Sequence, residues 1–246
     1  MKMRILAVLA ALAMASASIA ATDNANDVAY DSGINGQNGG SGFNAWSVSG
    51  GGSFGSFIGS SVGQGFGDID VSGEAFGFWA NPAGANFVNA DRTFSSVLAI
   101  GETFSIDLAI AFRNGNKGID LDVGAGTGVW NFNVGGDVYS AGLTGFGVDL
   151  GWAYSQTSIF QLDVTQISAT EISVVMTRGG DVYNSGNLAV GGQLTGFGLY
   201  NSGTDAGDDR NNLFANNLQV VPEPSTMVMA LMGALGLVAA RRRLQK

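Results

Sequence analysis

The amino-acid sequence predicts an all-β protein whose body, residues 22–220, folds as one antiparallel β-sandwich, flanked by an N-terminal signal helix and a C-terminal hydrophobic helix. Three observations carry this prediction. Apolar and polar residues alternate with period two over many short segments, which is the pattern of half-buried strands. Glycine-rich turns separate these segments, and the chain holds 39 glycines. No long stretch outside the two ends has helical periodicity, which favours a sandwich or barrel.

Residues 1–20 have the features of a secretory signal peptide. Lys2 and Arg4 supply the positive beginning, and residues 5–14 form an apolar run. Ser18 and Ala20 occupy the −3 and −1 positions of a signal peptidase site, so we expect signal peptidase to cleave after Ala20. Ten helical residues reach about 15 Å, half of a ~30 Å hydrocarbon core, so the run is too short for a permanent anchor.

The strands of the body are predicted from alternation. It is clearest over residues 103–112, where every second side chain from Phe104 to Phe112 is apolar and one face is wholly hydrophobic. A half-buried strand requires such a face. A last strand is expected to end with Leu218 and Val220, just before the tail. Shorter alternating runs cover residues 119–123, 130–134, 160–164 and 172–176.

The turns between these strands agree with the pattern. Residues 113–118 contain Asn-Gly between two alternating runs, which is a strong hairpin signal. Two short pieces recur along the chain: residues 136–139 return 44 positions later, and Leu-Thr-Gly-Phe-Gly at residues 143–147 returns 51 positions later, at residues 194–198. Because the two offsets differ, there is no fixed repeat period, and a solenoid is not expected.

The first half of the body resembles the lectin-like, concanavalin-like jelly-roll modules of bacterial surface proteins. Five short aromatic and glycine-rich pieces carry this likeness, at residues 42–46, 57–61, 75–81, 92–94 and 101–104. The resemblance implies that the sandwich is a jelly roll. It stands beside the argument from alternation, which reaches the antiparallel sandwich independently.

The C-terminal segment, residues 221–246, has three parts in a fixed order. Val221-Pro222-Glu223-Pro224-Ser225 is rigid and polar, because its prolines fix φ and disfavour helix before them. An uncharged stretch follows, and we expect a short transmembrane segment at residues 226–240. Arg241, Arg242 and Arg243 come next and would stay on the cytoplasmic side by the positive-inside rule. The body, already exported, would lie outside.

This tripartite tail resembles the PEP-CTERM sorting signal of Gram-negative bacteria, whose signature tripeptide corresponds to Pro222, Glu223 and Pro224. The resemblance implies that these residues are recognised by exosortase, a membrane-embedded protease, and that the chain is anchored briefly in the inner membrane. It then implies delivery to the cell surface or extracellular matrix, in association with exopolysaccharide and biofilm. The alternative is a simple C-terminal membrane anchor with a proline-rich linker.

Composition excludes several kinds of chemistry. The chain has no cysteine and no histidine, so disulfides, thiolate or imidazole metal sites and a Ser-His-Asp triad are absent. Residues 21–221 hold five basic and nineteen acidic side chains, which gives a net charge of −14. Such a body repels phosphate backbones, so nucleic acid is not an expected partner.

The acidic residues leave two chemical hypotheses open. A glycosidase would need two facing carboxylates, but sequence does not say which residues face one another. Asp107, Asp120 and Asp122 lie at outward positions of strands, where a solvated charge is ordinary, so we assign no catalytic residue and expect no enzyme. The other candidates for such a pair are Asp68, Asp70, Glu74 and Glu102.

No cofactor is expected from the sequence, and calcium is the one ion that the acidic residues leave open. Asp205, Asp208 and Asp209, with Asn211 and Asn212, form an oxygen-rich segment of the kind that hard cations take, and they are our calcium candidates. Residues 68–74 resemble the start of an EF-hand loop, but its twelfth position is Trp79 instead of Glu. No other cofactor is expected.

Sugar binding would use exposed aromatic side chains beside Asp and Asn. The tryptophans are the candidates, although Trp130 shares a face with Phe132 and Val134 and is expected in the core. Trp46, Trp79 and Trp152 stay open. We therefore expect an exported, exosortase-processed protein that is structural or associated with exopolysaccharide. The alternative is a secreted carbohydrate-active enzyme with a carboxylate pair.

Overall fold

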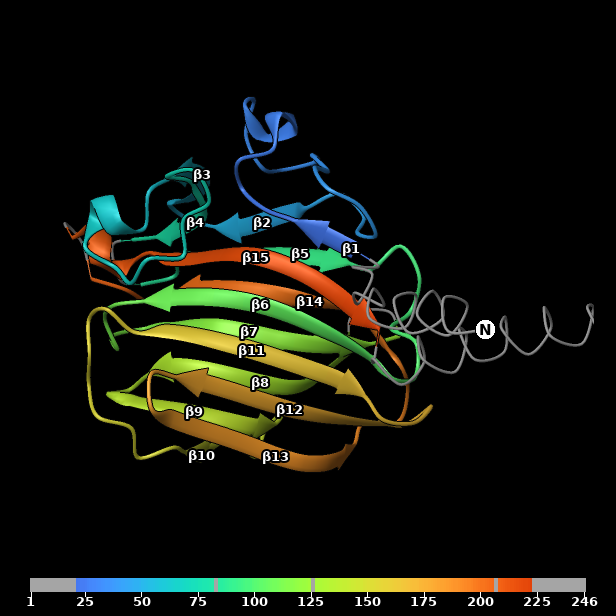
Figure 1. Ribbon diagram of the computed structural model, residues 1–246. Helices are drawn as coiled ribbons and strands as arrows, with labels where there is room; N and C mark the ends of the chain where they lie inside the picture. The colour runs from blue at the N-terminus through green and yellow to red at the C-terminus, as the bar shows by residue number, and fades with distance from the viewer. Residues whose placement is uncertain (1–20, 82–83, 125–126, 206–207, 223–246) are drawn as a thin grey trace, which may run out of the picture.

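The computed structural model describes residues 21–81, 84–124, 127–205 and 208–222. They form two antiparallel β-sheets that pack face to face, with three short 3-10 helices in the connections (Figure 1). This confirms the predicted all-β antiparallel sandwich. The predicted signal peptide, with Ala20, and the predicted C-terminal helix at residues 226–240 lie outside the described residues. Within the described ranges, no helix has the length and apolar character needed to cross a membrane.

One sheet has eight strands and includes both ends of the described chain. Its first seven strands follow the order β13-β12-β11-β6-β15-β4-β3, and the eighth, β1, pairs with β15. These strands span Asp181–Ala189, Glu171–Arg178, Ile159–Gln166, Glu102–Ile110, Leu213–Pro222, Ala75–Ala80, Phe54–Gly59 and, for β1, Ala21–Asp23.

The other sheet has seven strands in the order β10-β9-β8-β7-β14-β5-β2. They span Val148–Asp149, Val138–Leu143, Thr127–Gly135, Asn116–Val123, Leu194–Ser202, Phe87–Thr93 and Ser47–Gly51. Successive strands often change sheet: β4 lies in the first, β5 in the second and β6 in the first again. The 3-10 helices are η1 (Val28–Tyr30), η2 (Val62–Gln64) and η3 (Asp209–Asn211).

The core lies between the sheets and is made by the alternating residues. In β6, the side chains of Phe104, Ile106 and Leu108 are buried and belong to the main hydrophobic cluster. Trp130 and Phe132 of β8 enter the same cluster, as predicted. Two details differ from the sequence prediction. Strand β6 ends at Ile110, and β7 already begins at Asn116. The connection therefore covers residues 111–115 instead of the predicted 113–118.

A buried ion pair fixes the N-terminal segment to the body. Asp23 of β1 pairs with Arg92 of β5, and both side chains are fully buried. The hydroxyl of Tyr30 donates a hydrogen bond to the same carboxylate. The guanidinium lies 4.9 Å from the ring centre of Phe43 and 4.8 Å from that of Trp46. Because a buried charge is costly without a partner, Arg92 and Asp23 hold residues 21–46 against the sandwich.

The two ends of the sandwich meet at β1 and β15. Ala21 lies opposite Val220, so the strands begin one residue before the predicted range 22–220 and end two residues after it, at Pro222. The pairing is antiparallel, so the first and last strands of the described chain, β1 and β15, lie side by side in one sheet (Figure 1). The pairing therefore brings the two ends of the described chain together.

A second, smaller core covers the outer face of the eight-stranded sheet. The loop of residues 60–74 lies over β4, β6 and β15 and buries a separate hydrophobic cluster there: Phe66, Ile69, Ala75, Ala109, Ala111 and Phe214. Asp70 holds this loop by accepting hydrogen bonds from Ser60 Oγ at 2.6 Å and from Ser61 Oγ at 2.6 Å. The EF-hand-like residues 68–74 thus serve as a loop anchor.

Candidate functional site

The outer face of the seven-stranded sheet has a hollow where β14 lacks side chains. In β14, Phe197 and Leu199 point into the core, so Gly196 and Gly198, which alternate with them, occupy outward positions. Gly198 pairs with Asp91 of β5 on one side and with Asp120 of β7 on the other. The backbone of β14 is therefore the floor between two carboxylates.

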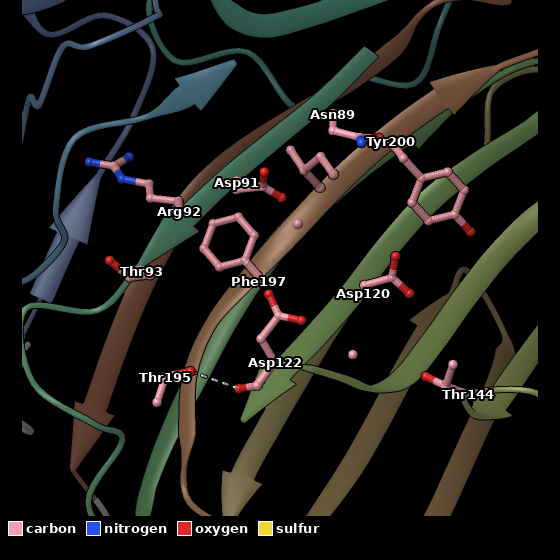
Figure 2. A pocket seen from close by; sticks show the side chains of 13 residues that line it. Asn89, Asp91, Arg92, Thr93, Asp120, Asp122, Thr144, Thr195, Phe197 and Tyr200 are labelled. Atoms are coloured by element: carbon pink, nitrogen blue, oxygen red, sulfur yellow. Dashed lines mark hydrogen bonds between the residues drawn. The ribbon is translucent and has the colours of Figure 1, made fainter. Parts of the chain in front are cut away.

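A third carboxylate completes the arrangement. Gly196 pairs with Thr93 of β5 and with Asp122 of β7, two residues along the same strands. We call this the acidic hollow: the floor of Gly196 and Gly198 with Asp91, Asp120 and Asp122 around it. Its volume is about 480 Å³, which lies in the range of small-molecule sites. Figure 2 shows the three carboxylates grouped beside the ribbon of β14.

The hollow depends on glycine at these positions, because any side chain there would meet its walls. A Cβ atom on Gly198 would lie 2.7 Å from Asp91 Oδ1, and one on Gly196 would lie 2.5 Å from the carbonyl oxygen of Arg92. On the far wall, a Cβ atom on Gly128 would lie 3.8 Å from Asp122 Oδ1 and 3.8 Å from Thr144 Oγ1. Larger residues would fill the space or displace its walls.

Burial and mutual repulsion disfavour ionisation of the carboxylates in the hollow. Burial, together with the nearby charges of Asp120 and Asp91, raises the pKa of Asp122 to about 6. The pKa of Asp120 is raised by burial and by Asp91, and that of Asp91 is raised by burial. Arg92 is the only basic residue among the described residues that line the hollow, and its guanidinium is directed into the core, towards Asp23. The site therefore carries uncompensated negative charge.

Hydrogen bonds fix the wall on the β7–β8 side. Asn131 Nδ2 donates to Asp120 Oδ1 at 2.9 Å and to Tyr200 Oη at 2.9 Å. The hydroxyl of Tyr200 lies 3.1 Å from the carbonyl oxygen of Phe132 and 3.0 Å from Asn133 Oδ1. Burial raises the pKa of Tyr200, so it stays neutral. Asp120 is held by this network, while no hydrogen bond to another described residue is found for the Asp122 carboxylate.

This geometry defines what the hollow can do chemically. Ionised carboxylates accept hydrogen bonds only, so a ligand must supply hydroxyl or ammonium donors. A cation would lower the pKa of each carboxylate and relieve their repulsion. A hydrolytic reaction would need one carboxyl to act as an acid, which a pKa of about 6 for Asp122 permits at neutral or mildly acidic pH.

The sequence predicts part of this site. It placed Asp120 and Asp122 on the outward face of a strand, and the structure confirms that placement. It missed Asp91, Gly196 and Gly198, because pairing between β5, β7 and β14 joins distant parts of the chain. One signal was present: the recurring Leu-Thr-Gly-Phe-Gly pieces each contribute a threonine, Thr144 and Thr195, to the hollow.

The remaining carboxylates of the predicted set do not join this site. Asp107 lies on the outer face of the other sheet, where it accepts a hydrogen bond from Asn217 Nδ2 at 2.8 Å. Burial raises its pKa. Glu102 accepts a hydrogen bond from the backbone nitrogen of Ala99 at 2.9 Å. Asp68 and Glu74 lie in the loop of residues 60–74 that Asp70 anchors, on the other sheet.

The calcium candidates have protein partners of their own. Asp208 accepts hydrogen bonds from the Arg210 guanidinium at 2.7 and 3.0 Å. Asp205 accepts one from Asn114 Nδ2 at 3.0 Å. Asp209 is exposed at the start of η3. Among the residues that the structure describes, no group of three or more acidic side chains is arranged to hold a metal ion. Calcium binding stays a prediction.

The tryptophans separate into buried and half-buried ones. Trp46 and Trp130 are buried in the core, so neither is a sugar platform. Trp152 is half-buried and stacks on Phe160, with ring centres 6.3 Å apart. Trp79 is also half-buried, on the outer face of β4. Trp79 and Trp152 are therefore the tryptophans that offer part of their surface to solvent.

The sorting motif begins inside the sandwich. Pro222 is the last residue of β15, where it lies opposite Glu102 of β6. Glu223 and Pro224, like Ala20, lie outside the described residues. A proline is tolerated at the end of a strand because the position needs no further N–H donor. Pro222 therefore belongs to a paired strand of the sandwich.

Comparison with known proteins identifies the tail. Residues 220–243 match the PEP-CTERM protein-sorting motif. No curated protein matches the chain in sequence. Similar solved structures include a sialidase, with 12% identity, a TM-score of 0.46 and coverage of 82% of this chain and 18% of the sialidase. They also include the botulinum neurotoxin serotype D binding domain, with 10% identity, a TM-score of 0.43 and coverage of 89% of this chain and 51% of that one.

A further structure of the serotype D ligand binding domain, in complex with N-acetylneuraminic acid, has 11% identity and a TM-score of 0.42. It covers 89% of this chain and 51% of its own. The chain thus spans about half or less of the length of these structures. The PEP-CTERM motif indicates export with transient membrane anchoring and delivery to the surface.

Proposed function

We propose that this protein is carried to the surface of a Gram-negative cell by exosortase and there binds a polysaccharide that contains protonated amino sugars. The tail supports the first step, since residues 220–243 match the sorting motif. The acidic hollow supports the second. We also propose that the sandwich is a jelly roll, because strands that follow one another in sequence, such as β4, β5 and β6, alternate between the sheets.

The observation that carries the binding function is the placement of three carboxylates around a glycine floor. Burial raises the pKa of all three carboxylates, and neighbouring charges also raise those of Asp120 and Asp122. Ionising them in the folded protein therefore costs stability. A cluster that costs stability is expected where a ligand supplies the compensating charge. Saccharide hydroxyls and ammonium groups are the donors that carboxylates accept.

The charge of the body selects the class of saccharide. Residues 21–221 carry a net charge of −14, and the hollow concentrates part of it. Chains rich in uronic acids or phosphate would be repelled. A glucosamine-containing chain offers both ammonium and hydroxyl groups, so its charge is complementary to that of the hollow.

A titration with defined oligosaccharides tests this binding. The probes are a fully deacetylated glucosamine hexamer, an N-acetylglucosamine hexamer and a galacturonate hexamer, each measured by calorimetry near pH 6. We expect the hollow to bind the deacetylated hexamer, and Asp122→Asn to weaken that binding by about tenfold. Equal affinity of wild type and D122N for the deacetylated hexamer would overturn the proposal, as would preference for galacturonate.

The sorting step has its own test. We expect mature protein from a producing strain to begin at Ala21 and to end between residues 221 and 225 when its mass is measured. Pro222→Ala combined with Pro224→Ala should leave the tail attached, because the recognition tripeptide is lost. A surface protein that still ends at Lys246 would contradict processing and favour a simple anchor.

A second function, glycoside cleavage, is favoured by one observation. Burial and neighbouring charges raise the pKa of Asp122 to about 6, so it can donate a proton while Asp120 or Asp91 stays ionised. Release of new reducing ends from the bound polysaccharide would show cleavage. In that case D122N should abolish release, and wild type that binds the chain without cutting it would exclude this function.

A further inference from the structure

A second surface, on the opposite face of the sandwich, presents two aromatic side chains. Phe57 of β3 and Trp79 of β4 point outward from the eight-stranded sheet and are each half-buried. Both lie within one pocket of about 380 Å³, whose other lining residues are polar. We call Phe57 and Trp79 the aromatic platform.

Glycines opposite the two rings explain how they lie. Trp79 pairs with Gly55, and a Cβ atom on Gly55 would lie 2.7–2.9 Å from three atoms of the indole. Phe57 pairs with Gly77, where an added Cβ atom would lie 2.4–2.8 Å from three atoms of the phenyl ring. Each ring therefore lies over the backbone of the neighbouring strand instead of standing upright.

The ring of Phe57 is fixed in this position from below. It meets Phe214 edge to face, with ring centres 5.5 Å apart and an interplanar angle of 87°. Phe214 belongs to the smaller core under the loop of residues 60–74. Phe57 and Trp79 are each half-buried, so part of each ring stays accessible to a ligand.

Polar side chains surround the platform. Gln64 at the end of η2 accepts a hydrogen bond from Asn212 Nδ2 at 2.9 Å, which fixes that side of the pocket. Asn81 and Asp209 line it as well. No hydrogen bond from the side chain of either residue to another described residue is found, so their oxygens can accept hydrogen bonds from a ligand.

We propose that the aromatic platform is a second saccharide site, where the C–H face of a pyranose ring packs on Trp79 and its hydroxyls donate to Asn81 and Asp209. Pyranose rings have an apolar face and a polar edge, and this pocket offers an aromatic surface with a polar rim. Binding here does not depend on the acidic hollow. Because the two sites lie on opposite faces, one molecule would hold two polysaccharide chains and link them.

Neutral oligosaccharides separate this site from the hollow. The probes are the N-acetylglucosamine hexamer and cellohexaose, with affinity measured by calorimetry. We expect wild type to bind at least one of these neutral probes. Trp79→Ala should weaken that binding by about tenfold, and Asp209→Ala should weaken it by about threefold. D122N should leave that binding unchanged. Trp152→Ala is the matched control, because Trp152 is equally half-buried but lies against Phe160, outside the platform.

Thermal unfolding keeps the test independent of folding. Asp209 is exposed, so D209A should melt as wild type does, whatever W79A does to the fold. Failure of wild type to bind either neutral hexamer, or equal affinity of wild type, W79A and D209A, would overturn the platform proposal. Binding of a proline-rich peptide in place of the saccharides would overturn it as well. If wild type bound a neutral hexamer but not the deacetylated hexamer, that result would count only against the acidic hollow.

Linking of chains gives the last readout. Wild type mixed with partly deacetylated chitin polymer should form large particles detected by light scattering. D122N and D209A should each reduce their formation several-fold, because each weakens one of the two sites that must be engaged together. Particles of undiminished size with D209A would show that the platform plays no part in linking.

Discussion

The acidic hollow and the aromatic platform use the same residue, glycine on the outward face of a strand, with opposite results. Over Gly196 and Gly198 a hollow remains, because only one side-chain atom, Asp91 Oδ1, comes within 3 Å of an added Cβ atom there. Over Gly55 and Gly77 the space is filled, because Trp79 and Phe57 lie across it. The side chains on the paired strands therefore decide whether a strand glycine opens a pocket or supports a ring.

The physical reason is hydration. A carboxylate keeps its water and avoids its like-charged neighbours, so it covers less of the adjacent backbone than a ring does. An aromatic ring gains about 25 cal/mol for each Å² of apolar surface that it buries, so it lies over the glycine and compensates for the flexibility of the strand. The platform thus stabilises the fold, whereas the hollow weakens it.

Filling the platform glycine should have the largest effect on stability. We expect Gly77→Ala to lower the free energy of unfolding by about 1–3 kcal/mol, because the new methyl group displaces Phe57 from its contact with Phe214. Urea unfolding measures this loss. Combining G77A with Phe57→Ala should give less than the sum of the two losses. Additive losses would contradict the packing of Phe57 over Gly77.

Filling the hollow should instead affect binding. We expect Gly198→Ala to weaken binding of the deacetylated hexamer by about tenfold, because its methyl group occupies the floor of the hollow and displaces Asp91. Stability should change by less than about 1 kcal/mol, since the displaced group is a side chain in contact with water. Gly180→Ala is the control, because a Cβ atom there meets nothing within 4 Å. Unchanged affinity of G198A would contradict the assignment of the floor.

Removing one charge from the hollow should stabilise the protein slightly. Between the pKa of Asp122 in the unfolded chain, about 4, and its folded value of about 6, the folded state binds more protons. Stability from this group is therefore present at low pH and is lost as pH rises through 6. We expect D122N to raise the free energy of unfolding by about 1 kcal/mol at pH 7 and by less at pH 4. Equal effects of D122N at pH 4 and pH 7 would contradict the raised pKa.

The sequence predicts the core better than either surface. Side chains such as Phe104 and Ile106 recur at every second position, so one segment is enough to place them inside. The hollow needs three strands from distant parts of the chain, and Asp91 follows small residues without clear alternation. For the platform, the sequence offers only Trp79 as one of several candidate tryptophans. It does not predict the pairing of β3 with β4 that brings Phe57 beside it.

The sorting tail shows the opposite balance between sequence and structure. Its order of prolines, apolar stretch and arginines is recognisable without a fold, and residues 220–243 match the motif. The sequence did not indicate that Pro222 would end a paired strand or that Ala21 would lie opposite Val220. Such pairing joins the two ends of the body and is set by the sheet, not by either segment alone.

The most direct test of the binding site is the pKa of Asp122, measured by carboxyl carbon NMR with and without the deacetylated glucosamine hexamer. The free protein should give a value near 6. Saturating hexamer should lower that value, because an ammonium group in the hollow favours the ionised carboxylate. A pKa that is the same in the free and the saturated protein would contradict the account.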